Sequence, residues 1–187
     1  MAPTHPVNRQ DLLAAFKWPT EIESLVSPTD GMCDFDVLWS LAYIRQPRWI
    51  VELGTRSGIS TRVLRNACPK ANLLTVDVDD CSHHLKGVDC TFWHMPAEQA
   101  LEKYLWETDL LFIDTSPHSY EQTKVWMETW VAKKLRCGGI ACFHDTISYK
   151  GVIGAIQEWT ASNPGWIFTE FGAGFGLGVL QCPLEPR

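Results

Sequence analysis

Short apolar runs alternate along the chain with longer segments in which apolar residues recur every three or four positions. The runs with the length and composition of strands are Arg48–Leu53, Asn72–Val76, Cys90–His94, Asp109–Ile113 and Ile140–His144. The helical period predicts helices between and after them, at Ile59–Ala67, Ala97–Leu105, Tyr120–Leu135 and Gly151–Ser162. Because strands and helices alternate, the pattern is typical of an α/β fold with a largely parallel sheet.

The alternation stops near the end of the chain. Two β-like runs, Trp166–Glu170 and Gly176–Gln181, are joined by a glycine-containing connection that leaves no room for a helix. We therefore expect a doubly wound, mostly parallel sheet that is closed by an antiparallel hairpin. Dinucleotide-binding half-folds differ, since they continue with parallel units.

Two helical stretches, Arg9–Lys17 and Asp34–Arg45, precede the first strand. Apolar side chains form one stripe on the second, so we expect this helix to pack on the sheet. The first is expected to cap a cleft or to contact a second subunit. We therefore divide the chain into an N-terminal helical segment, 1–47, packed on a core domain, 48–187.

Composition and charge narrow the range of partners. The net charge is −6, with no basic cluster to neutralise phosphates, so we expect no nucleic-acid partner. No apolar run approaches the roughly 20 residues that span a bilayer, and the first ten residues lack the apolar core of a signal peptide. These features predict a cytoplasmic protein with no membrane partner. The residues leave open whether it forms a homo-oligomer.

The seven cysteines are expected to be free thiols, most of them buried, in a reducing compartment. A possible zinc cluster consists of Cys81, His83, His84, Cys90 and His94. These residues lack the closely spaced pairs of a structural zinc site, and Cys90 falls in a predicted strand. A loop and part of the core are the favoured interpretation of this segment.

The segment VELGTRSG, residues 51–58, ends the first strand and opens a helix. Gly54 and Gly58 allow a sharp turn and a close approach of the backbone to a ligand. Such a loop can hold a pyrophosphate, as in nicotinamide cofactor sites, but its spacing is not G-x-G-x-x-G. An acid at Glu52 favours a cationic group, such as the amino group of an amino acid.

Two further strand ends carry candidate ligand contacts. Asp77 ends the second strand roughly 20 residues after the loop, where an acid can accept hydrogen bonds from ribose hydroxyls. Pro96 and Ala97 follow the third strand, where an adenine ring could lie with its polar edge near Glu98. Alternatively, Pro96 and Glu98 are simply residues that favour a helix start.

From Trp49 to about Gly178 the chain resembles the small class I methyltransferases that depend on S-adenosylmethionine (SAM). It is most similar to catechol-type O-methyltransferases and cephalosporin-hydroxylase-like proteins, through the segments VELGTRSGIST, LLTVDVD, DLLFIDTSPHSYEQTKVWMETW and LRCGGIACFHDT. The resemblance implies a Rossmann-like class I methyltransferase fold, with Asp77 on the ribose and Pro96 and Ala97 on the adenine. It implies that the methionine part contacts the loop and its surroundings, namely Glu52, Gly54, Thr55, Arg56, Ser57, Gly58 and Asp114.

Asp114 and Asp145 follow the fourth and fifth strands, whose ends lie roughly 5 Å apart if the strands are neighbours. Two converging carboxylates repel each other unless a cation neutralises them or one is protonated. Mg²⁺ suits carboxylates, waters and a substrate oxygen, and the resemblance implies metal ligands at both aspartates, with His144 as a possible third. The alternative is that Asp145 caps a helix that begins near Ile147.

Catechol-type enzymes carry a general-base lysine shortly after the first metal-ligating aspartate, and this chain has no lysine there until Lys124. His118 or His144 could act as the base, because imidazole titrates near neutral pH. The predicted catalytic residues are therefore Asp114, His118 and His144. Trp18 and Trp93 could line an acceptor pocket, although packing in the core is the simpler interpretation of both.

The sequence thus predicts a SAM-dependent methyltransferase that modifies a hydroxyl group of a small molecule, such as a sugar or natural product, with possible help from Mg²⁺. One alternative is a nicotinamide-dependent oxidoreductase, which the glycine spacing and the terminal hairpin disfavour. Another is a non-catalytic SAM-fold binding protein. Its cofactor loop would be expected to be damaged, whereas Glu52, Gly54, Gly58 and Asp77 are all present.

Overall fold

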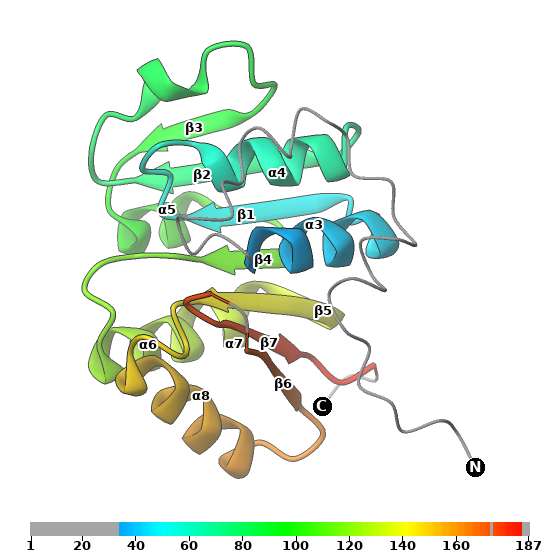
Figure 1. The fold of residues 1–187 in the computed structure, drawn as a ribbon, viewed down its shortest axis with the longest axis vertical. Helices are drawn as coiled ribbons and strands as arrows, with labels where there is room; N and C mark the ends of the chain where they lie inside the picture. The colour runs from blue at the N-terminus through cyan, green and yellow to red at the C-terminus, as the bar shows by residue number, and fades with distance from the viewer. Residues whose placement is uncertain (1–33, 173, 185–187) are drawn as a thin grey trace.

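The computed structural model describes residues 34–172 and 174–184 as one mixed sheet flanked by helices (Figure 1). The strand order is β3-β2-β1-β4-β5-β7-β6. The strands are β1 Trp49–Leu53, β2 Asn72–Asp77, β3 Thr91–His94, β4 Thr108–Ile113, β5 Leu135–His144, β6 Ile167–Phe171 and β7 Leu177–Gln181. The first five pair in parallel, whereas β7 lies antiparallel between β5 and β6. The predicted fold, a mostly parallel doubly wound sheet with a terminal hairpin, is confirmed.

Helices cover both faces of this sheet. On one face lie α3 Asp34–Arg45 and α4 Ile59–Ala67. On the other lie α5 Ala97–Lys103, α6 Tyr120–Trp126 with its continuations η2 Met127–Val131 and α7 Ala132–Lys134, and α8 Lys150–Ser162. A short 3-10 helix, η1 Ser82–Leu85, lies between β2 and β3. The predicted helix Arg9–Lys17 and Trp18 lie outside the described residues.

Strand β4 shows why the central strands are nearly continuous apolar runs. Successive side chains of a strand point to opposite faces of the sheet. Leu110 and Phe112 pack with α3 and α4, whereas Leu111 and Ile113 pack with α5, α6 and α8. All four are almost completely buried, and each such side chain contributes about 1.5–3 kcal/mol on leaving water. Two apolar faces therefore hold the strand ends, and the loops that follow them, in place.

The junction before β5 differs from the prediction. The helix ends at Lys134, and the strand begins at once at Leu135 rather than at Ile140. Leu135 pairs with Thr108, and the register then shifts before Ile140 pairs with Leu110. Gly138, at φ 72°, therefore lies in an irregular stretch of the strand and does not form a turn before it.

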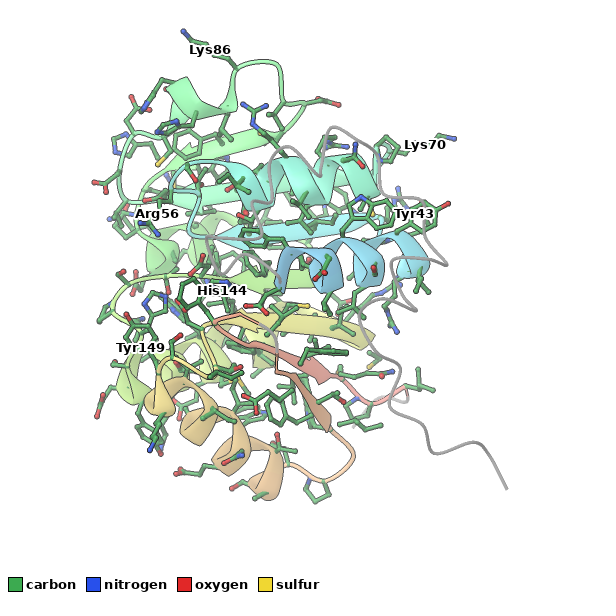
Figure 2. The ribbon with its side chains drawn as sticks, in the orientation of Figure 1. Tyr43, Arg56, Lys70, Lys86, His144 and Tyr149 are labelled. Atoms are coloured by element: carbon green, nitrogen blue, oxygen red, sulfur yellow. The ribbon has the colours of Figure 1, made fainter. Side chains whose placement is uncertain are left out.

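The carboxyl ends of the parallel strands meet along one edge of the sheet. Figure 2 shows Arg56, His144 and Tyr149 toward this edge, on the left, and Lys70 toward the opposite edge. In open α/β sheets, ligands bind outside the carboxyl ends of the strands.

No helix in the described part of the chain is both long and apolar enough to cross a membrane.

Candidate functional site

Two adjoining cavities open at the carboxyl ends of the strands. The loop cavity, of about 390 Å³, is lined by residues after β1, β2, β3 and β4, among them Gly54, Asp77, Ala97 and Asp114. The acid cavity, of about 510 Å³, is lined by residues after β4 and β5 together with Phe175. Arg56, Asp114 and Ser116 line both cavities. One ligand in each cavity would therefore meet the other at Asp114.

Gly54 brings the loop after β1 against the end of β4. Its φ is 94°, and its N–H donates to the carbonyl oxygen of Val76 at 2.8 Å. A Cβ at this position would lie 1.9 Å from the carbonyl oxygen of Asp114, which is backbone and has no freedom to move aside. Only glycine fits here, so the loop and Asp114 depend on each other for their positions.

Asp77, at the end of β2, fastens the same loop from the other side. Its Oδ2 accepts hydrogen bonds from the N–H groups of Thr55 and Arg56 at 2.8 and 2.9 Å, and its Oδ1 accepts one from Asp79. Burial alone would raise the pKa of this carboxyl, but the backbone donors outweigh it and lower the pKa. An ionised carboxylate therefore stands in the wall of the loop cavity.

The remaining predicted cofactor residues occupy different positions. Arg56 has a positive φ of 45° and lines both cavities, whereas Ser57 is exposed and outside both linings. Gly58, at φ 69°, precedes α4. After β3, Ala97 lines the loop cavity, whereas Pro96 occupies the N-cap position of α5.

Glu52 lies beneath the loop and not at a cavity wall. Its side chain is fully buried, and Thr61 Oγ1 donates a hydrogen bond to its Oε2 at 2.6 Å. Burial raises the pKa of this carboxyl to about 7. This hydrogen bond joins β1 to α4. Glu52 therefore supports the loop between these two elements.

We expect the stability of a Glu52→Gln variant, relative to that of the wild type, to increase as the pH rises. The pKa of Glu52 is about 7 in the folded protein and 4.5 in the unfolded chain. The protonated carboxyl therefore stabilises the folded wild type fully below pH 4.5, and this stabilisation is lost as the pH rises through about 7. Between about pH 5 and about pH 8 the variant should gain about 2–3 kcal/mol in unfolding free energy relative to the wild type. Urea unfolding at both pH values measures this difference, and a difference that is independent of pH would contradict it.

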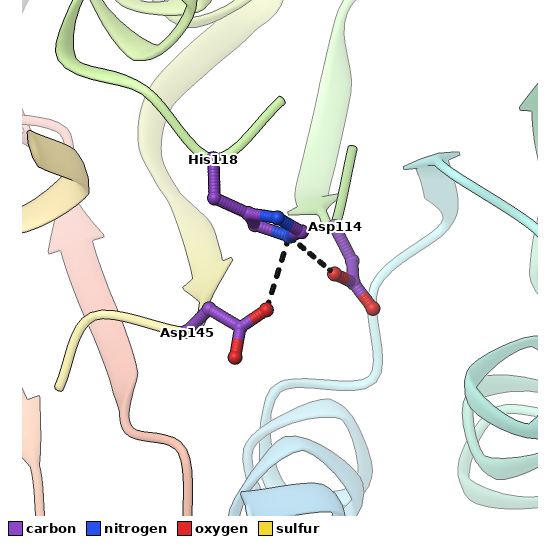
Figure 3. A group of neighbouring side chains, drawn as sticks. All are labelled: Asp114, His118 and Asp145. Atoms are coloured by element: carbon purple, nitrogen blue, oxygen red, sulfur yellow. Dashed lines mark hydrogen bonds and ion pairs between the residues drawn. The ribbon is translucent and has the colours of Figure 1, made fainter. Parts of the chain in front are cut away.

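Asp114, His118 and Asp145 form the acid cluster of the second cavity (Figure 3). The Nε2 atom of His118 lies 3.2 Å from Asp114 Oδ1 and 3.0 Å from Asp145 Oδ2. The predicted convergence of Asp114 and Asp145 is therefore present, with an imidazole between them. The alternative in which Asp145 caps a helix near Ile147 is wrong, because α8 begins at Lys150 with Tyr149 as its N-cap.

His144 approaches the same two carboxylates from the end of β5. Its Nδ1 lies 3.5 Å from Asp114 Oδ1 and 3.4 Å from Asp145 Oδ2. Its other nitrogen, Nε2, lies 3.7 Å from Oδ2 of Asp34 on α3. Both predicted catalytic histidines are thus brought to the two aspartates.

The two imidazoles of the cluster favour the protonated form. Hydrogen bonds that the carboxylates of Asp114 and Asp145 accept from its imidazole raise the pKa of His118 to about 9. Burial opposes the charged form of His144, but the same carboxylates outweigh it and raise its pKa to about 10. Burial raises the pKa of both aspartates, but the two histidines outweigh it. They lower the pKa of Asp114 to about 2 and hold the pKa of Asp145 well below its usual range.

These groups fit a divalent cation. Ligand atoms of Asp114, His118 and Asp145 all lie within 4.8 Å of one another. The two nitrogens of His144 are buried without a hydrogen-bond partner among the described residues. Carboxylate oxygens and imidazole nitrogens are metal ligands once they are deprotonated, and an ion would replace the protons that now neutralise the carboxylates.

Asp34 and two aromatic residues of the site were not identified from the sequence. Tyr149 and Phe175 line the acid cavity and are each a little under half exposed. An acid at a helix start, such as Asp34, is usually interpreted as a cap or a dipole partner. The apolar stripe of this helix predicts that it packs on the sheet, and this was the one sequence signal that its first residue, Asp34, would be buried there.

The segment that contains Cys81 and Cys90 does not form a metal-competent group in the described residues; the group found is Asp114, His118 and Asp145. Trp93 packs against the core and lines a separate cavity of about 680 Å³. That cavity lies at the amino ends of β1, β2 and β3, away from the acid cluster. Trp93 therefore does not line the acid cavity.

A profile of a methyltransferase domain family matches residues 51–146. This match covers the glycine loop, Asp77, Asp114, His118 and Asp145. No curated protein sequence matches the chain at a significant level.

Several solved structures share the fold. An O-methyltransferase of Bacillus cereus in complex with S-adenosylhomocysteine (SAH) is 17% identical, with 92% of this chain and 96% of that chain covered and a TM-score of 0.69. An SAH-bound methyltransferase of Podospora anserina is 16% identical, with coverages of 97% and 99% and a TM-score of 0.70. An O-methyltransferase from Streptomyces achromogenes involved in tomaymycin synthesis, in complex with SAM, is 19% identical, with coverages of 89% and 91% and a TM-score of 0.65.

Proposed function

This chain belongs to the methyltransferase domain family, with the fold of the class I SAM-dependent enzymes, and we propose that it transfers the methyl group of SAM to a hydroxyl group of a small molecule. The observation that carries the proposal is the continuity of the two cavities. The glycine loop and Asp77 line one, the acid cluster lines the other, and Asp114 lies in both. The family assignment excludes the nicotinamide-dependent alternative.

The loop cavity is the proposed SAM site. Gly54 lines this cavity where the methionine part would lie, and Asp77 would present an ionised carboxylate toward the ribose hydroxyls. The loop after β3, with Met95, Ala97 and Glu98 in the cavity wall, would hold the adenine. Two of the solved structures described above bind SAH and one binds SAM, which supports the same ligand here.

The acid cavity is the proposed acceptor site. Asp114, Asp145 and His118 would hold a divalent cation, whose charge lowers the pKa of an acceptor hydroxyl nearby. Arg56 lies at the junction of both cavities, and Asp114 sets the end of β4 against the glycine loop. The protein's contribution is alignment and exclusion of water, because the sulfonium of SAM is already a good leaving group.

The acceptor is proposed to be small, with an apolar ring or chain beside its hydroxyl group. The cavity of about 510 Å³ is within the usual range for small-molecule sites. Tyr149 stacks on His118 with ring centroids 4.7 Å apart, and Phe175 meets His144 edge to face. These rings would cover an apolar body while the acid cluster faces the hydroxyl, as a natural product or a sugar with an apolar face would require.

Replacement of Asp77 by alanine is expected to weaken SAH binding by about 10- to 100-fold, because a charge-assisted hydrogen bond contributes about 1.5–3 kcal/mol. The loss has two sources: the ribose contact and the anchoring of Thr55 and Arg56. Calorimetric titration with SAH measures the affinity. Asp89 is exposed and outside both cavities, so Asp89→Ala is the matched control. An unchanged affinity in the Asp77 variant would remove Asp77 from the cofactor site.

A screen for SAH production tests the acceptor class. The purified chain would be incubated with SAM and matched sets of phenols, sugars, amines and thiols, with and without EDTA. The proposal predicts SAH production with hydroxylated acceptors, and loss of that production with EDTA. Turnover with amines or thiols alone would contradict O-methylation, and turnover indifferent to EDTA would contradict the metal.

A further inference from the structure

Asp34, the first residue of α3, is an acid buried in an unusual way. Its side chain is fully buried, and neither carboxylate oxygen has a hydrogen-bond partner among the described residues. Backbone N–H groups of Phe175 and Gly176 face it. Among the described residues the imidazole of His144 also faces it, with Nε2 3.7 Å from Oδ2. Burial of an ionised carboxylate costs free energy unless a partner compensates it. The placement of Asp34 beside His144 therefore calls for a physical explanation.

The ring of His144 is held in one orientation. Phe35, next to Asp34 in α3, stacks on it with centroids 5.6 Å apart and planes 17° apart. Phe112 and Phe175 meet the ring edge to face at 6.4 and 6.1 Å. With Nε2 toward Asp34, Nδ1 must point to Asp114 and Asp145.

Each of the two imidazoles lies at ligand-like distances from the same two carboxylate oxygens. His118 Nε2 lies 3.2 and 3.0 Å from the two carboxylate oxygens, and His144 Nδ1 lies 3.5 and 3.4 Å from the same two atoms. A tetrahedral centre with bonds of about 2.0–2.1 Å separates neighbouring ligand atoms by about 3.3 Å. All four separations are close to that value.

We propose that Asp34 is a positioning residue that directs His144 Nδ1 toward Asp114 and Asp145, so that with His118 they form a two-imidazole, two-carboxylate site selective for a transition-metal ion over Mg²⁺. A carboxylate that accepts the second N–H of a ligating histidine fixes its tautomer and raises its basicity. Imidazole suits ions such as Zn²⁺ and Co²⁺, whereas Mg²⁺ prefers oxygen ligands and keeps its waters. The inference rests on the proposed function and changes the Mg²⁺ expected from the sequence.

The test measures metal affinity in the full chain after EDTA treatment and dialysis. Co²⁺, Zn²⁺ and Mg²⁺ would each be titrated by calorimetry, and Co²⁺ also by its visible absorption, which reports coordination geometry. The variants are Asp34→Ala and Asp34→Asn, with Asp36→Asn as the matched control. Asp36 is a second buried acid in the first turn of α3, and its Oδ1 accepts the N–H of Val37.

We expect the wild type to bind Co²⁺ and Zn²⁺ more tightly than Mg²⁺, with the absorption of low-coordinate Co²⁺. Asp34→Ala should weaken Co²⁺ and Zn²⁺ binding by about 10- to 100-fold. Asp34→Asn should lose less, because the amide oxygen keeps an acceptor in the place of the carboxylate oxygen that lies nearest His144 Nε2. Asp36→Asn should bind all three ions as the wild type does.

Mg²⁺ binding as tight as that of Co²⁺ would overturn the inference, as would an unchanged affinity in both Asp34 variants. Equal losses in Asp34→Asn and Asp36→Asn would also overturn it, since they would show a general structural effect of the helix. If Asp34→Ala does not fold, Asp34→Asn and His144→Ala carry the test. SAH titration of the same samples separates the two claims: intact SAH binding with Mg²⁺ preference contradicts only this inference, whereas absent SAH binding contradicts the proposed function.

Discussion

Replacement of Gly54 by alanine is expected to abolish SAH binding and to destabilise the fold by about 2–5 kcal/mol. Two costs combine. The residue has φ 94°, which side chains other than hydrogen disfavour, and the new Cβ would lie 1.9 Å from the carbonyl oxygen of Asp114. Relief of this clash requires the loop after β1 or the end of β4 to move, and both line the proposed cofactor site.

Gly87→Ala is the matched control for this change. Its φ is also positive, at 77°, but nothing lies within 4 Å of a Cβ built there. This variant should lose only about 1–2 kcal/mol for the backbone conformation and should bind SAH normally. Urea unfolding and SAH titration measure both effects. An alanine at position 54 that binds SAH like the wild type would show that the close approach to Asp114 is not needed.

Replacement of Asp145 by asparagine is expected to reduce methyl transfer by about 100- to 1,000-fold, because a charge aimed at the reacting group is lost. The change keeps the size of the side chain, which lies 3.0 Å from His118 Nε2 and 3.4 Å from His144 Nδ1. Removal of one carboxylate leaves both imidazoles with Asp114 alone. SAH affinity should stay within a few-fold of the wild type, because Asp145 does not line the loop cavity.

Steady-state kinetics with added metal measure the rate of methyl transfer, and titration with SAH measures cofactor affinity. Together they test whether the variant loses turnover while it keeps cofactor binding. Asp89→Asn serves as the control, since it removes a carboxylate outside both cavities. Methyl transfer that is unaffected in the Asp145 variant would exclude this residue from metal binding and from catalysis. A parallel loss of SAH affinity would instead place Asp145 at the cofactor.

Much of the fold could be predicted because the central strands are buried on both faces. Leu110 and Phe112 face one helical layer and Leu111 and Ile113 the other, so the apolar run itself marks the strand. The start of β5 at Leu135 could not be predicted in this way. Gly138 and Gly139 look like a turn in sequence, whereas the strand pairs with β4 on either side of them and their backbone groups bond to Pro183 and Cys182, just after β7.

The candidate site could be predicted where the chemistry follows directly after a strand. Asp77, Asp114 and Asp145 each come at the carboxyl end of a parallel strand, so the topology brings them to one edge. Asp34 could not be found by that rule, because it reaches the cluster from a helix that packs across the sheet. Its role depends on the ring of His144 and on a contact of 3.7 Å between residues far apart in the chain.

Calorimetric titration of the purified chain with SAH, beside NAD⁺ under the same conditions, tests the central claim most directly. The account predicts micromolar binding of SAH, no binding of NAD⁺, and loss of the SAH signal in the Gly54→Ala variant. Absence of SAH binding by the folded wild-type protein would contradict the proposal that the cavity between Gly54, Asp77 and Asp114 is a working SAM site, and would favour a binding protein that has kept only the fold.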